Sequence, residues 1–157
     1  MHVENTSFDL RWELRGSGWA TLTVRAGAEE LRVITSYVGH GLQSFLRAAA
    51  DLRIGSHGSW AWLPDEPQAH ILLFAVVGAD VAVRVLWVPD ETAEDPWAGA
   101  RTEWFGRVRL DAFLDAADRM GRAVLDEHGA DGYRRRWRDM PFPHAELDLL
   151  CGELPAR

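Results

Sequence analysis

Carboxylates and tryptophans are concentrated on both sides of the longest apolar run of the sequence, residues 71–88. Because Gly78-Ala79-Asp80 divides this run, and Gly and Asp favour turns, we expect it to form a β-hairpin. The segments before and after a hairpin lie at the same end of it, so they should form one acidic-aromatic surface. The residues of this predicted surface are Trp60, Trp62, Asp65, Glu66, Asp90, Glu91, Glu94, Asp95 and Trp97.

Clustered carboxylates raise one another's pKa and repel, so they need solvent, a cation or a basic partner. Solvation is the simplest interpretation, and a tryptophan beside a loop is often only a lid on the core. The sharper hypothesis is that this surface docks a basic protein, with acids steering the encounter and a tryptophan anchoring it. A metal is less favoured because the sequence contains no Asp-x-Asp-x-Asp-Gly loop. We therefore predict no cofactor and no metal.

Catalytic motifs are missing from the sequence. The chain has no lysine, which excludes a Schiff base and a Walker-type phosphate lysine. The Gly-Ser-His-Gly-Ser segment at 55–59 has the wrong order for a nucleophile elbow. The six histidines show no H-x-x-x-H or H-E-x-x-H spacing, so surface or core positions are expected for them. They are His2, His40, His57, His70, His128 and His144.

Composition narrows the class of protein and of partner. With 157 residues, 47% hydrophobic, the chain should form a single domain, residues 1–157. A net charge of −7 argues against nucleic acid or an anionic membrane as the main partner. No run is long enough to span a bilayer, no secretory signal is recognisable, and one cysteine permits no intrachain disulfide, so we expect a cytoplasmic bacterial protein. The arginines at 134, 135, 136 and 138 are interpreted as a solvated face.

Hydrophobic periodicity predicts an α+β fold. Alternation of apolar and polar residues indicates strands, and a spacing of three to four residues indicates helices. We expect an antiparallel sheet of about six or seven strands, with two main helices packed on one face. The predicted strands are residues 8–15, 19–25, 31–35, 60–63, 71–77, 81–88 and 102–109; the main helices are 42–52 and 110–128, followed by a C-terminal helical extension at 131–151.

The two main helices share the pattern L-x-x-F-L-x-A-A, which begins at Leu42 and again at Leu110. This indicates a βββα unit present twice, with halves at 8–55 and 71–129. The alternative is that amphipathic helices rich in Leu and Ala simply look alike. In either case we expect one shared core, formed by Phe45, Leu46, Leu73, Val83, Val85, Phe113 and Leu114.

The order of motifs between residues 31 and 137 resembles a known group of domains. The motifs are F-L-x-A-A-x-x-L, W-A-W-L-P, the hydrophobic hairpin with Gly at its tip, W…V-R-L and a second F-L-x-A-A. The chain resembles small, mostly actinobacterial domains of unknown function in the style of immunity proteins of polymorphic toxin systems. The resemblance implies sheet hairpins alternating with two amphipathic helices, and binding of a toxin rather than catalysis.

We therefore expect a non-catalytic, immunity-like protein-binding domain that binds a basic partner through the acidic-aromatic surface. The alternative is a small-molecule-binding or enzymatic domain with a cavity between sheet and helices. A filled core with an exposed acidic-aromatic patch would favour the first, and a deep pocket with several histidines or carboxylates would favour the second. The sequence leaves the oligomeric state open.

Overall fold

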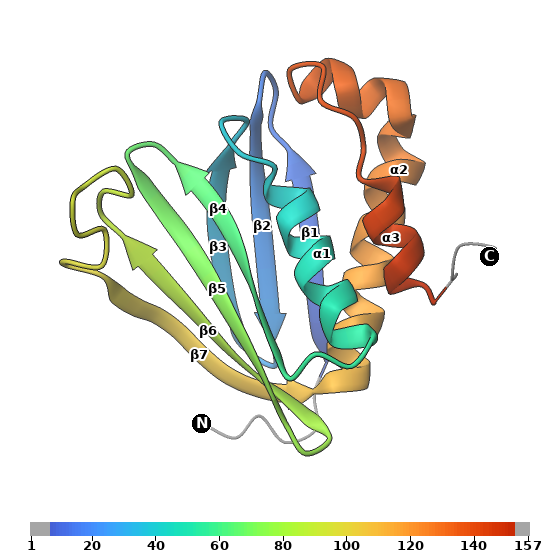
Figure 1. Ribbon diagram of the computed structural model, residues 1–157. Coiled ribbons are helices and arrows are strands. Elements are labelled where there is room, and N and C mark those ends of the chain that lie inside the picture. Colours follow the sequence, from blue (N-terminus) through green and yellow to red (C-terminus); the bar gives the residue numbers. More distant parts are fainter. Residues whose placement is uncertain (1–6, 153–157) are drawn as a thin grey trace.

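The computed structural model describes residues 7–152 as an α+β fold of antiparallel strands and helices, which confirms the predicted class (Figure 1). The helices lie together on one side of the strands in this view. The elements are β1 (Phe8–Leu14), β2 (Trp19–Ala26), β3 (Glu29–Ser36), α1 (Gly41–Arg53), β4 (Gly58–Asp65), β5 (Gln68–Val77), β6 (Asp80–Val88), β7 (Arg101–Arg109), α2 (Leu110–Arg136) and α3 (His144–Leu150).

The strands form two sheets, which corrects the expectation of one. Strands β1-β2-β3 make a three-stranded sheet and β4-β5-β6-β7 a four-stranded one. The outer edge of β4 is occupied by α1: the Trp62 backbone amide donates to Ser44 Oγ at 2.9 Å, and Ser59 Oγ donates to the Ala48 carbonyl at 2.8 Å. Strand β3 reaches β4 through a side chain, since Thr35 Oγ1 donates to the Pro64 carbonyl at 2.9 Å. Proline has no N–H, so Pro64 cannot donate a backbone hydrogen bond to β3 at this position.

The central hairpin is present as predicted. Strands β5 and β6 pair antiparallel, with Val77 opposite Asp80 at the turn, and Gly78 adopts a φ of 61° that suits glycine. Strand β5 lies between β4 and β6, a central position that suits its apolar residues. The predicted duplication remains a hypothesis; α1 follows three strands and α2 follows four.

Among the described residues there are three helices rather than two main ones. The helix predicted at 110–128 continues as α2 to Arg136, with a break at Gly129, where φ is 67° and ψ is 168°. This break accommodates a change of direction that buries Tyr133 and Trp137. The predicted C-terminal extension contains α3. Within residues 7–152, no helix has the length and apolar character needed to cross a membrane.

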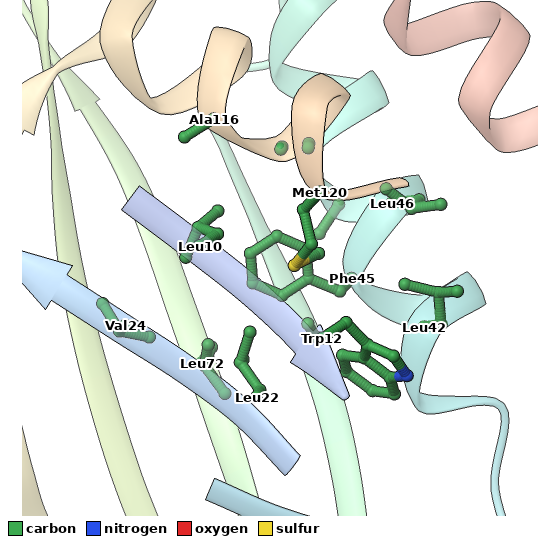
Figure 2. Close-up of a cluster of buried hydrophobic side chains, with 14 of the residues drawn as sticks. Leu10, Trp12, Leu22, Val24, Leu42, Phe45, Leu46, Leu72, Ala116 and Met120 are labelled. Carbon is green, nitrogen blue, oxygen red and sulfur yellow. The ribbon is translucent and has the colours of Figure 1, made fainter. Parts of the chain in front are cut away.

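The core lies between the two sheets and the helices, and aromatic rings join these layers (Figure 2). The ring of Phe113 on α2 lies 5.9 Å from that of Phe8, 6.0 Å from Phe45 and 5.1 Å from Phe74. Figure 2 shows core side chains from α1, from α2 and from both sheets converging. Its labelled residues are Leu10, Trp12, Leu22, Val24, Leu42, Phe45, Leu46, Leu72, Ala116 and Met120.

The predicted core set is correct for most of its members. Phe45, Leu46, Val83, Val85 and Phe113 are buried, and Leu114 is partly buried against them. Leu73 is the exception, since 38% of it is exposed. The reason is the two-residue period of a strand: Leu72 and Phe74 face inward, so Leu73 faces outward.

Candidate functional site

The outer face of the four-stranded sheet carries large apolar side chains exposed to solvent. The strand register places Trp60 opposite Leu73 and Trp62 opposite Ile71, so these side chains form neighbouring cross-strand pairs. Trp60 is 59% exposed and Trp62 is 38% exposed. Isolated apolar residues are common on protein surfaces, whereas a contiguous patch of them marks an interaction site.

A groove of about 450 Å³ runs over this face, and its walls are almost entirely apolar. Strands β4, β5 and β6 supply two of its tryptophans and three aliphatic side chains. The loop between β6 and β7, residues 89–100, supplies the remainder. The lining residues are Trp60, Trp62, Ile71, Leu73, Val88, Glu91, Pro96 and Trp97. Together with Glu66 and Glu94, these residues are called the acidic-tryptophan groove below.

The two acidic segments meet, as the hairpin geometry predicted. The Glu91 backbone amide donates to the Pro67 carbonyl at 2.8 Å, which ties the 89–100 loop to the β4–β5 turn. Figure 1 shows the olive loop at the same end of the sheet as this turn. Four of the predicted residues, Trp60, Trp62, Glu91 and Trp97, line one groove.

Two predicted acids shape the loop itself. Asp90 Oδ1 accepts the Thr92 amide at 2.9 Å and the Thr92 hydroxyl at 2.7 Å. These hydrogen bonds, led by that of the hydroxyl, lower the pKa of Asp90. Asp95 Oδ1 accepts the Trp97 amide at 3.1 Å. Such Asx turns fix the backbone, and the second one positions the tryptophan of the loop.

The remaining predicted acids differ in their surroundings. Asp65 Oδ2 accepts a hydrogen bond from the Gln68 side chain at 3.0 Å, within the β4–β5 turn. Glu66 and Glu94 are exposed. Glu91 is half-buried, and its Oε2 is enclosed without a hydrogen-bond partner. Glu91 is thus the one acid of the predicted set that lines the groove.

The environment of Glu91 disfavours its charge. Burial is the main cause that raises its pKa, and the nearby carboxylates of Glu66 and Asp90 raise it further. A hydrogen bond from the Trp62 side chain offsets part of this effect. A half-buried carboxylate with a free oxygen and like charges around it would be stabilised by an incoming cation.

Sequence reasoning missed the aliphatic part of the groove. Ile71, Leu73, Val88 and Pro96 line it but were not among the predicted site residues. The signal was present in strand β5, whose residues are apolar on both faces. An apolar pattern on both faces is typical of a central strand, and it does not reveal that one face of β5 is open to solvent.

Between the sheets and the helices, the part of the core that the structure describes is occupied by buried side chains. Phe45, Leu63, Leu72, Phe113 and Met120 there are each at most 2% exposed. The other pocket described, about 510 Å³, lies by Trp19 and Ile34 on the outer face of the three-stranded sheet. No group of three or more His, Cys, Asp or Glu in residues 7–152 is arranged to hold a metal ion.

Two polar groups outside the groove have local roles. His70 Nε2 and Glu103 Oε2 lie 2.8 Å apart, near the first residues of β5 and β7.

The Cys151 thiol contacts Asp118 and Arg122 at 2.9 Å each. Burial first, and then Asp118, raises the pKa of this thiol to about 11. The cysteine is therefore protonated near neutral pH and is not an activated nucleophile.

Comparison of the chain with known protein families, with curated proteins and with solved structures found no match. The function is therefore inferred from the geometry of the described residues.

Proposed function

We propose that this protein is a non-catalytic binding domain that docks a basic protein on its acidic-tryptophan groove. The observation that carries the proposal is the groove itself: exposed tryptophans meet a half-buried carboxylate, one oxygen of which has no hydrogen-bond partner, on an open sheet face. Buried aromatic anchors surrounded by a polar rim are typical of the energetic centre of protein interfaces. The acids at the rim would accelerate the encounter with a positively charged surface.

The sequence resemblance favours an immunity-like role within this proposal. Such a role needs a rigid surface that covers a partner and no reaction centre. The groove meets the first requirement because most of its lining comes from three paired strands. The loop that completes it is fixed by the Asx turns at Asp90 and Asp95. A preorganised surface loses less conformational entropy on binding than a flexible one.

A small-molecule site is the second candidate, because the volume of the groove lies within the usual range for ligand pockets, about 300–1,000 Å³. Pockets of that kind generally place several polar groups around the ligand. Here the lining offers Glu91 and the indole N–H groups as its polar side-chain atoms. The protein partner is therefore favoured.

The test is affinity capture from the source bacterium with matched charge variants. The groove variant carries Glu66→Lys, Glu91→Lys and Glu94→Lys, which leaves the two loop-shaping aspartates intact. The control carries three exposed acids of α2 changed in the same way, so the net charge is identical: Asp115→Lys, Asp126→Lys and Asp131→Lys. The proposal predicts a basic protein captured by the wild type and by the control but lost from the groove variant. Equal capture by all three, or loss from the control alone, would overturn it.

A further inference from the structure

Three aromatic rings of the described residues, two exposed and one partly buried, are covered by arginine. The Arg101 guanidinium carbon lies 4.4 Å from the centre of the Trp87 ring. Arg84 lies 5.2 Å from Phe105, and Arg138 lies 4.8 Å from Tyr37. A guanidinium stacks on aromatic faces because it is planar, delocalised and weakly hydrated.

The tryptophans of the groove are not covered in this way. Within residues 7–152, the cation–aromatic pairs are the three just described, and none of them involves Trp60, Trp62 or Trp97. Trp60 and Trp97 are more than half exposed, at 59% and 55%. Their faces are therefore free to receive a cation from outside.

Among residues 7–152, the charged neighbours of the Glu91 carboxylate beside these rings are Glu66 and Asp90, which are both acidic. Glu91 Oε2 is enclosed and has no hydrogen-bond partner, and the Trp62 side chain donates a hydrogen bond to the carboxylate. A carboxylate without a basic neighbour, next to open aromatic faces, offers the two contacts that a guanidinium makes best: stacking, and hydrogen bonding to a carboxylate oxygen.

We propose that the groove binds an arginine side chain of the basic partner, with its guanidinium stacked on a groove tryptophan and paired with Glu91. This inference rests on the proposed function and specifies its recognition chemistry. The methylene stem of the arginine would lie over apolar side chains such as Ile71 and Leu73. Lysine fits less well because its compact ammonium is strongly hydrated and cannot stack as a plane.

The test uses three capped peptides of equal length: hexa-arginine, hexa-lysine and hexa-citrulline, the last being a neutral isostere of arginine. Their affinities are measured by isothermal titration calorimetry on the wild type, Glu91→Gln, Trp97→Ala and Glu127→Gln. Glu127→Gln is the matched control because it makes the same chemical change at an exposed carboxylate of α2, outside the groove. Circular dichroism establishes that each variant is folded before titration.

We expect hexa-arginine to bind the wild type at least about fivefold more tightly than hexa-lysine, and hexa-citrulline to show no measurable binding. Glu91→Gln should weaken the binding of hexa-arginine about tenfold, whereas Glu127→Gln should change it less than about twofold. Trp97→Ala should reduce the preference for arginine over lysine.

Equal affinity for the arginine and lysine peptides, with equal effects of Glu91→Gln and Glu127→Gln, would overturn the arginine inference. That result would leave a general preference for basic proteins, and so the proposed function, intact. A different result would refute the proposed function itself: capture of the same proteins by the wild type and by the variant with Glu66→Lys, Glu91→Lys and Glu94→Lys. Absence of binding to any peptide would likewise overturn the arginine inference alone.

Discussion

Replacement of Phe113 with alanine should lower the free energy of unfolding by about 3–5 kcal/mol. The side chain is 1% exposed, and its ring contacts Phe8 of β1, Phe45 of α1 and Phe74 of β5 at centroid distances of 5.1 to 6.0 Å. Loss of the buried ring accounts for about 3 kcal/mol of transfer free energy. The cavity left among three rigid rings adds the remainder, because the surrounding layers can collapse only partially.

The measurement is equilibrium urea unfolding followed by circular dichroism. Phe105→Ala is the control, because it makes the same chemical change at a ring that is 45% exposed on the outer face of β7. Its only described partner is the guanidinium of Arg84, so its loss should stay within about 1 kcal/mol. In thermal unfolding, Phe113→Ala should lower the midpoint by about 6–20 °C. A loss below about 1 kcal/mol, or equal losses for the two variants, would refute the packing described for the core.

Three further predictions concern the groove and its support. Glu91→Gln should stabilise the protein above the raised pKa of Glu91, because folding then no longer encloses a charge. The gain should disappear below about pH 4, where the carboxyl is protonated in both the folded and the unfolded state. Gly41→Ala should cost about 1–3 kcal/mol, since an added Cβ would lie 2.9 Å from Leu63 Cδ2. Changing Glu66, Glu91 and Glu94 to lysine should slow association with a captured basic partner about 10- to 100-fold at low salt.

Each of these predictions has its own control and its own contradicting result. The pH-dependent gain should be missing in Glu94→Gln, and a Glu91→Gln variant less stable than the wild type at every pH would contradict the assigned environment. Gly132→Ala is the control for the α1 glycine: a Cβ there meets its nearest atom at 3.5 Å, so no loss is expected. The slower association should vanish at high salt, and association unchanged at low salt would rule out steering by this surface.

Local topology made the position of the site predictable from the sequence. A single hairpin joins the two acidic segments, so their proximity follows from one turn at Gly78 and needs no knowledge of distant packing. Burial of the apolar stripe of α1 that contains Phe45, and of alternate residues in β1, could be predicted equally well, because it follows from a short repeating pattern.

The separation of the sheets and the open face of β5 were not predictable in the same way. Two hydrogen bonds hold α1 against the edge of β4, one accepted by Ser44 and one donated by Ser59, and these serines carry no such signal in sequence. In β5, Leu72 and Leu73 are identical in type, so hydrophobicity could not tell which faces the core. The distinct role of Glu91 depends on the three-dimensional path of the 89–100 loop.

The most direct test of the central claim is a nitrogen–proton NMR titration of the tryptophan indole groups with capped hexa-arginine and capped hexa-lysine. The account predicts that the Nε1–H signals of Trp60, Trp62 and Trp97 shift as a basic peptide is added. Trp19 is the internal control: it is 44% exposed but lies on the outer face of the other sheet, so its signal should stay unchanged. Shifts confined to Trp19, or binding of a basic peptide that shifts no groove indole, would contradict the claim that this groove receives a basic partner.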